Sequence, residues 1–166
     1  MLLNLASILD SPGARLPYQV SLDLSDLTFG SNQPVCQPVQ AEGVIRNTAG
    51  VLVMTGSIRT TLHCVCDRCT AEFQRSVDSP VDAVLVSQLS QEEDEEPNVF
   101  ELTGDSADLE EIITTIFVLN MDSKFLCSED CKGLCFRCGK NLNEGPCSCQ
   151  KEPDPRFAAL KQLLNK

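Results

Sequence analysis

Hydrophobic and polar residues alternate along much of the first half of the chain. The alternation is loose in LPYQVSLDL (16–24) and in VQAEGVIRN (39–47), and it continues through GVLVMTGSIRTTLHC (50–64). Successive side chains of a strand point to opposite faces of a sheet, so this pattern predicts strands with one covered face.

The segments between these strands also carry signals. NTAG, from Asn47 to Gly50, predicts a hairpin turn. A further strand is expected over FQRSV (73–77) and, after Pro80, over VDAVLVSQ (81–88). Together these strands predict an antiparallel meander that is covered on one face.

The pattern changes to a helical period in DLEEIITTIFVLNM (108–121). Asp108 is a good N-cap, and Glu111 follows three residues later, as in a capping box. The apolar residues recur at helical spacing and predict a stripe that packs on the sheet as core: Leu109, Ile112, Ile113, Ile116 and Phe117.

A second helix is expected over DPRFAALKQLLNK (154–166), where Asp154 caps and Pro155 takes the first helical position. Its apolar face, with Phe157, Leu160 and Leu164, either docks on the protein or meets a partner.

Charge is distributed unevenly. The formal net charge is −11, and thirteen acidic residues but no basic ones lie between Arg75 and Lys124. Such a surface repels phosphate, which favours a basic protein partner over a long RNA footprint. The polar break SQEEDEEPN (90–98) predicts a solvated loop or a docking strip for that partner, with five candidate residues: Glu92, Glu93, Asp94, Glu95 and Glu96.

The predicted fold class is α+β. A mostly antiparallel meander or barrel-like domain with one packed helix is expected over residues 1–123, and a cysteine-rich zinc-knuckle lobe with the terminal helix over 124–166. The opening MLLNLASILDSPG has no basic residue before its apolar stretch and no small-residue cleavage site, so we expect an edge strand or short helix instead of a signal peptide. We therefore expect a cytoplasmic protein.

Ten cysteines carry the candidate chemistry. Reducing cytosol disfavours structural disulfides, so clustered cysteines there indicate metal or redox sites. CFRCG places two thiols on a tight turn whose N–H groups can bond the sulfurs, and CSC follows after a turn sequence. Four thiolates fit tetrahedral zinc, which predicts a first site: Cys135, Cys138, Cys147 and Cys149. The one-residue gap in CSC leaves Cys149 open as a bystander.

The remaining cysteines predict a second zinc site between the two parts of the chain. CVCDRC offers a Cys-x-x-Cys pair at a strand end, and CSEDC offers two more thiols before the knuckle. The predicted ligands are Cys66, Cys69, Cys127 and Cys131. In a local alternative, Cys64 or His63 replaces one ligand, and Cys36 is expected to be a packed or idle thiol.

Other chemistries fit these cysteines less well. A redox pair usually stands at a helix N-terminus in a βαβ context, which neither pair has here. The spacing departs from ferredoxin patterns, although iron is also held by four thiolates. Catalytic zinc normally keeps an open position with His or carboxylate ligands, so a closed site of four thiolates indicates a structural clamp.

The order of these motifs resembles the YceD family, the large ribosomal RNA subunit accumulation proteins. The resemblance is carried by LCSEDCKGLCFRCGKNLNEGPCSC and DPRFAALKQLL, with Phe136 where proline is expected in that family. It implies a non-enzymatic role in the accumulation of large-subunit ribosomal RNA, and so in ribosome biogenesis.

Two modes of action follow, with a third of lower standing. The protein binds a basic ribosomal protein or an assembly intermediate, or it binds RNA directly through a zinc ribbon; the lesser alternative is a thiol redox protein. Residues 124–166 carry eight basic and five acidic residues, while tryptophan is absent and Tyr18 is the only tyrosine, which leaves few residues for base stacking. No membrane and no small-molecule substrate is expected.

Overall fold

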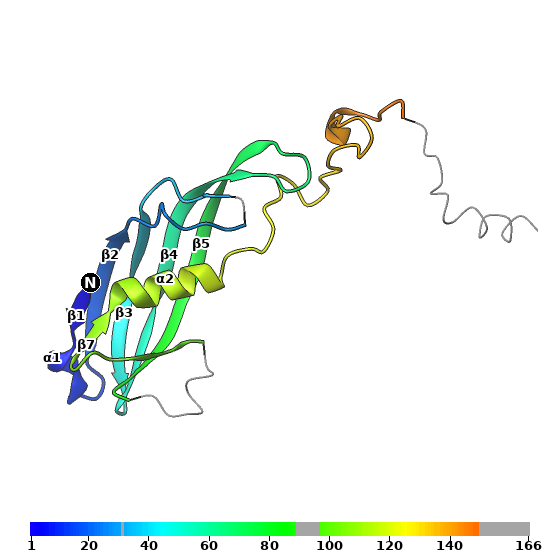
Figure 1. Cartoon of the computed structure of the whole chain (residues 1–166). Helices are drawn as coiled ribbons and strands as arrows, with labels where there is room; N and C mark the ends of the chain where they lie inside the picture. The colour runs from blue at the N-terminus through cyan, green and yellow to red at the C-terminus, as the bar shows by residue number, and fades with distance from the viewer. Residues whose placement is uncertain (31, 89–96, 150–166) are drawn as a thin grey trace, which may run out of the picture.

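The main element is an open five-stranded sheet (Figure 1), seen in a computed structural model that describes residues 1–30, 32–88 and 97–149. The strand order is β2-β3-β4-β5-β6, so β2 and β6 form the edges. The strands are β2 (Arg15–Leu22), β3 (Val39–Thr48), β4 (Val51–Val65), β5 (Glu72–Val86) and β6 (Val99–Glu101). The first four pair antiparallel in chain order, which confirms the predicted meander, and β6 adds parallel to β5.

The predicted hairpin turn lies between β3 and β4. Ala49 and Gly50 both have positive φ, 54° and 96°, and the side chain of Asn47 accepts a hydrogen bond from the Gly50 N–H at 2.8 Å. The same Asn47 amide donates to the carbonyl oxygens of Ile8 and Leu9 at 2.8 and 2.7 Å. One buried asparagine therefore closes the turn and also holds the short helix α1 (Ala6–Leu9).

Strand β5 is longer than the two segments expected on either side of Pro80. It runs through the proline, which lies opposite Ser57 of β4. Strand β6 pairs with β5 only from Val84 to Val86, so one side of β5 at Pro80 has no paired strand among the described residues. Proline is accommodated there because no ladder on that side is interrupted.

Helix α2 (Leu109–Leu119) crosses one face of the sheet (Figure 1). As predicted, Asp108 is the N-cap, and its side chain accepts a hydrogen bond from the Glu110 N–H at 3.1 Å. The predicted stripe is buried in full: Leu109, Ile112, Ile113, Ile116 and Phe117. The core therefore lies between this stripe and the covered face of the sheet.

The N-terminal segment pairs with the chain just before α2. Strand β1 (Leu2–Asn4) lies antiparallel to β7 (Ser106–Asp108). An edge strand and a short helix thus both occur in the opening segment, as expected. Among the described residues, no helix is long and apolar enough to cross a membrane.

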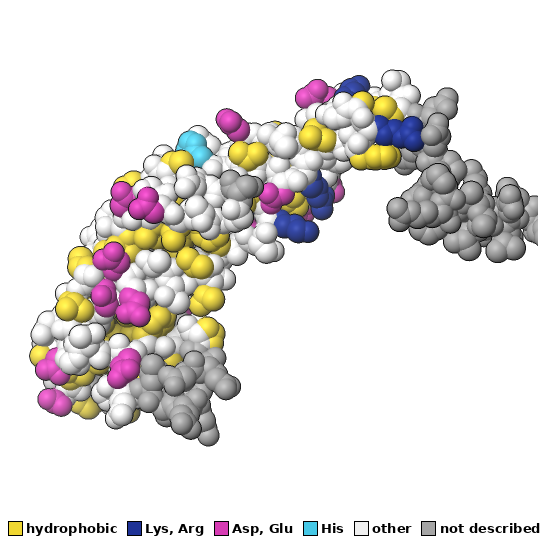
Figure 2. Space-filling model, in the orientation of Figure 1, with side chains coloured by type: hydrophobic (Ala, Val, Ile, Leu, Met, Phe, Trp, Pro, Cys, Tyr) yellow, Lys and Arg dark blue, Asp and Glu magenta, His cyan; other side chains and the backbone are white. Residues whose placement is uncertain are grey.

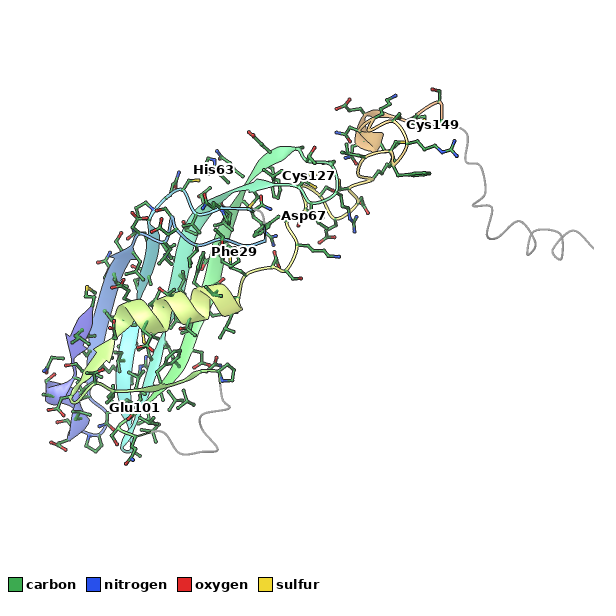
Figure 3. All side chains as sticks on the ribbon, viewed as in Figure 1. Phe29, His63, Asp67, Glu101, Cys127 and Cys149 are labelled. Atoms are coloured by element: carbon green, nitrogen blue, oxygen red, sulfur yellow. The ribbon has the colours of Figure 1, made fainter. Side chains whose placement is uncertain are left out.

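The loop between β2 and β3 covers the far end of β4. The carbonyl of Pro34 accepts from the His63 N–H at 2.8 Å, and the Asn32 side chain accepts from the Val65 N–H at 3.2 Å. Phe29 meets Phe125 edge to face, with ring centroids 6.3 Å apart. Figure 3 shows Phe29 at the same end of the sheet as Asp67 and Cys127, so this loop lies beside the cysteines.

Two expectations fall outside the described residues: the acidic strip 92–96 and the terminal helix 154–166. The division of the chain at residues 123 and 124 stays a prediction. Segment 125–134 contacts the β4–β5 turn through several hydrogen bonds, so the two predicted parts are joined there.

Candidate metal centres

Eight cysteines form two clusters in which the four Sγ atoms lie within 4.8 Å of one another. The proximal cluster consists of Cys66, Cys69, Cys127 and Cys131, and the distal cluster of Cys135, Cys138, Cys147 and Cys149. These are the two sets that the sequence predicts, including Cys149 despite its one-residue gap. Cys64 and His63 belong to neither cluster, so the local alternative finds no support in the geometry. Each cluster could hold a metal ion.

The proximal cluster begins in the turn between β4 and β5. The Cys66 N–H donates to the Ala71 carbonyl at 2.9 Å, and the Thr70 N–H donates to the Cys66 carbonyl at 2.9 Å. Thr70 has a φ of 59°, the left-handed conformation that closes the turn. This tight loop at the end of a long hairpin directs the thiols of Cys66 and Cys69 to one point.

The other two proximal thiols come from the segment that follows α2, and Asp67 fixes that segment. The Asp67 side chain accepts from the Phe125 N–H at 2.7 Å, and the Asp67 N–H donates to the Phe125 carbonyl at 2.8 Å. Arg68 donates from its guanidinium to the Cys131 carbonyl at 2.9 Å and to the Glu129 carbonyl at 3.3 Å. Figure 3 shows Asp67 and Cys127 close together at the tip of the hairpin.

The distal cluster is built on a knuckle around Cys135. The Cys135 N–H donates to the Lys140 carbonyl at 2.8 Å, and the Gly139 N–H donates back to the Cys135 carbonyl at 2.8 Å. Gly139 has a φ of 72°, as expected for a chain leaving a Cys-x-x-Cys turn. A short 3₁₀ helix, η2 (Leu142–Glu144), follows and leads the chain back to Cys147.

Asn143 of η2 connects the two clusters. Its Nδ2 donates to Cys131 Sγ at 3.3 Å, and its Oδ1 accepts from the Lys132 N–H at 2.8 Å. The Leu142 N–H also donates to the Gly133 carbonyl at 2.9 Å, while the Leu134 N–H donates to the Arg68 carbonyl at 3.0 Å. Segment 131–134 is therefore held between the β4–β5 turn on one side and η2 on the other.

The sulfur spacing fits a tetrahedral ion. Four ligands at ~2.3 Å from zinc would place their sulfurs about 3.8 Å apart. The Cys66 and Cys131 Sγ atoms are 3.8 Å apart, those of Cys69 and Cys127 3.6 Å, and those of Cys135 and Cys147 3.5 Å. A disulfide would need about 2.05 Å, so the geometry fits a shared ion and not paired disulfides.

Backbone N–H groups prepare one thiol of each cluster to ionise. Burial of the Cys66 thiol opposes ionisation, but N–H groups of Cys127, Arg68 and Cys69 outweigh it and lower its pKa to about 6. In the distal knuckle the N–H groups of Cys138 and Arg137 lower the pKa of Cys135 to about 6. Thiolates are the metal-binding form of cysteine, so both turns favour metal binding.

One other thiol in each cluster has its pKa shifted in the opposite direction. The bond from Cys127 to Cys69 raises the pKa of Cys127 to about 12, and the bond from Cys149 to Cys138 raises the pKa of Cys149 to about 12. Without an ion, the Cys127 thiol and the Cys149 thiol each keep a proton at neutral pH. A bound metal would replace that proton, so metal binding releases protons.

The remaining cysteines have separate surroundings. Cys64 is buried in the core, and burial is the main cause that raises the pKa of its thiol. Cys36 is exposed, with Sγ 3.9 Å from the Gln33 carbonyl oxygen, so it is an exposed thiol and not a packed one.

Sequence reasoning did not identify Asp67, Arg68 or Asn143 as parts of the site. Asp67 and Arg68 are the two residues between Cys66 and Cys69, and their position on a knuckle tip was the available signal. Asn143 lies in KNLNEGP, where asparagine is a common turn former and gives no hint of a bond to a sulfur.

Comparison with known proteins identifies the family. The family model described as large ribosomal RNA subunit accumulation protein YceD matches residues 54–164, which include both clusters and α2. The chain belongs to the YceD family. The resemblance inferred from its cysteine motifs is thereby confirmed.

The chain also matches parts of several curated proteins. An uncharacterized protein of Mycobacterium bovis and another of Mycobacterium tuberculosis are each 30% identical over 117 residues, or 69% of this chain and 56% of the relative. The chloroplastic YceD homolog 1 of Arabidopsis thaliana, named a large ribosomal RNA subunit accumulation protein, is 25% identical over 178 positions, or 87% of this chain and 52% of the relative. The chain spans about half the length of these curated relatives. No solved structure matches it.

Proposed function

We propose that this protein is a non-enzymatic, cytoplasmic ribosome-biogenesis factor that supports the accumulation of large-subunit ribosomal RNA. It acts by binding a basic ribosomal protein or an assembly intermediate. The observation that carries the proposal is the YceD family match, which extends over residues 54–164 and so includes both cysteine clusters.

Zinc in both clusters is part of the proposal. All ligand candidates within each described cluster are thiols, with neither a histidine nor a carboxylate among them. Four thiolates close the coordination sphere of zinc, which is the arrangement of a structural site and leaves no open position for a substrate. The proximal zinc would join the β4–β5 turn to the segment after α2, and the distal zinc would hold the knuckle.

The acidic surface supports a basic partner. Eight of the thirteen acidic residues between Arg75 and Lys124 lie in the described part of the chain. Most of them are exposed, among them Asp78, Asp82, Glu101 and Glu111. Figure 2 shows Asp and Glu side chains spread over the β-sheet part on this face. Such a field speeds association with a positively charged protein and repels bare RNA.

Metal content is the direct test of the clamps. Native mass spectrometry of the purified chain should show two zinc ions, and chelation should raise the number of titratable thiols by about eight. A metal-free chain with intact disulfides would support the thiol redox alternative instead.

Depletion in cells tests the biological role. Loss of the protein should lower the ratio of large-subunit to small-subunit ribosomal RNA, and the wild-type gene should restore it. A variant with the strip 92–96 neutralised to Gln and Asn should keep its zinc but lose co-purification of a basic ribosomal protein. An unchanged ribosomal RNA ratio in depleted cells would contradict the proposal.

A further inference from the structure

The tip of the distal knuckle presents an exposed aromatic ring. Phe136 is 86% exposed, more than any other large hydrophobic residue in the described part of the chain. It lies with Arg137 between Cys135 and Cys138, and the guanidinium carbon of Arg137 is 5.9 Å from the ring centroid. An aromatic face beside a guanidinium is a surface on which a planar group can stack.

A groove of about 500 Å³ adjoins this ring. Its walls combine apolar residues with two cations, and no acidic residue lines it: Lys132, Leu134, Cys135, Phe136, Arg137, Leu142, Pro146, Cys147 and Cys149. A third cation, Lys140, lies beside the groove, where its Nζ donates to the Pro146 carbonyl at 3.0 Å. Figure 2 shows this combination as hydrophobic side chains next to Lys and Arg on the lobe farthest from the sheet. The charge of the groove is thus opposite to that of the acidic β-sheet part, so it fits a different, negatively charged ligand.

The knuckle holds the ring in place. The Arg137 and Cys138 N–H groups bond the Cys135 sulfur, and the Gly139 N–H bonds the Cys135 carbonyl at 2.8 Å. The backbone on both sides of Phe136 is therefore fixed, and a metal in the distal cluster would fix it further. A ring on a rigid turn loses little conformational freedom when it binds, so exposure of this residue favours recognition.

We propose that Phe136, Arg137, Lys132 and Lys140, the Phe136 platform, bind a short unpaired segment of RNA. One base stacks on the Phe136 ring beside Arg137, while the two lysines, both exposed, meet the neighbouring phosphates. Base stacking uses the flat aromatic face, and the phosphates use the cations. An acidic peptide would use the cations alone.

The Phe136 platform deepens the proposed function. Only the assignment of the bound RNA as ribosomal RNA rests on that proposed function. It also changes the expectation from sequence that stacking residues are scarce, since Phe136 was noted there only as a departure from proline. The footprint is small. About three cations would contact the single strand. A plot of the logarithm of the binding constant against the logarithm of the salt concentration should therefore have a slope of about −2.

Fluorescence anisotropy with the zinc-loaded full chain and a labelled mixed-sequence 12-nucleotide RNA tests the platform. Replacing Phe136 by Ala should weaken binding roughly 5- to 150-fold, the range for loss of one base stack. Phe136→Trp should retain binding. Phe136→Leu keeps an apolar side chain without a ring, and it should weaken binding about as much as Phe136→Ala. Leu119→Ala, at another exposed apolar residue, should leave binding unchanged.

Three results would overturn the platform: no RNA binding by the wild-type chain, equal binding by Phe136→Leu and wild type, or equal competition by a polyglutamate peptide, which would assign the groove to an acidic protein. Each variant is first checked for its zinc content, so that a collapsed knuckle is not mistaken for a lost stack.

Cell depletion separates this inference from the proposed function. If depletion leaves the ribosomal RNA ratio unchanged, the biogenesis role fails while the binding data still stand for the platform. If the wild-type gene restores the ratio and Phe136→Leu restores it equally despite normal zinc, the role stands and the platform is overturned as part of it.

Discussion

Gly133 packs closely against Arg68 of the proximal turn, and its replacement by alanine gives a quantitative prediction. Gly133 has a φ of 71°, and a Cβ built there would lie 2.9 Å from the Arg68 carbonyl oxygen and 3.4 Å from Arg68 Cβ. The same carbonyl accepts the Leu134 N–H at 3.0 Å. Alanine would therefore carry a left-handed backbone and also push on the bond that joins segment 131–134 to the proximal turn.

Gly139 provides a matched control. It has a φ of 72°, but a Cβ there would meet no atom within 4 Å. Gly139→Ala should thus lose about 1–2 kcal/mol, the cost of a left-handed alanine alone. Gly133→Ala has the same backbone cost and in addition weakens a hydrogen bond worth about 1 kcal/mol, so its loss should be about 2–3 kcal/mol.

The assay is urea unfolding in zinc-saturated buffer, combined with chelator competition at each cluster. Gly133→Ala should lower the zinc affinity of the proximal cluster by about fivefold, since the weakened hydrogen bond is worth about 1 kcal/mol and a factor of ten corresponds to 1.4 kcal/mol. Gly139→Ala should act only on the distal cluster. If Gly139→Ala destabilises the protein as much as Gly133→Ala does, the close approach to Arg68 is not the constraint that the structure indicates.

Three further predictions concern the clusters and the sheet. Native mass spectrometry of Cys138→Ser should show one zinc ion instead of two, and the circular dichroism of the β-sheet part should be unchanged. Retention of both ions would exclude Cys138 as a ligand. Asn143→Ala should weaken proximal zinc binding roughly 10- to 100-fold in chelator competition although it is no ligand, because it removes the donor to Cys131 Sγ; an unchanged proximal affinity would contradict this. Burial raises the pKa of Tyr18 to about 12, and since the unfolded side chain ionises near ~10, folding stability should fall as the pH rises through that window. At pH 11 the loss relative to pH 9 should be about 1.4 kcal/mol in urea unfolding and should vanish in Tyr18→Phe.

Local sequence signals were sufficient for the helix and the hairpin. The stripe from Leu109 to Phe117 and the cap at Asp108 lie within a single helix, so residue spacing alone identifies them. The turn at Asn47 to Gly50 is likewise a local signal. The four-thiol sets were also within reach, because the Cys-x-x-Cys, CSEDC and CSC spacings identify pairs of thiols that could share an ion.

Nonlocal packing decided the features that sequence missed. A single strand runs through Pro80 only because one side of β5 is open there, a property of the sheet and not of the segment. The pairing of β1 with β7 joins residues about a hundred positions apart, and β6 adds in parallel, neither of which leaves a sequence pattern. Asn143 was missed because its bond to Cys131 Sγ depends on how η2 packs against segment 131–134.

The two clusters close chain loops of very different length, and this difference affects when each one forms. The paired sulfurs of Cys66 and Cys131 are separated by 65 positions, whereas those of Cys135 and Cys147 are separated by 12. Loop-closure entropy rises with the logarithm of loop length, so an unfolded chain needs about 1.5 kcal/mol more to close the longer loop.

During synthesis, Cys66 and Cys69 are made first and form only half of the proximal cluster. Cys127 and Cys131 complete it after β5 and α2 have been synthesised. The distal knuckle needs only its own short segment. A chain starved of metal, or stalled in folding, would therefore fill its distal cluster first. If it binds zinc as proposed, the proximal cluster would be filled mainly in chains whose sheet and helix are already assembled, so its occupancy would report the completion of the fold.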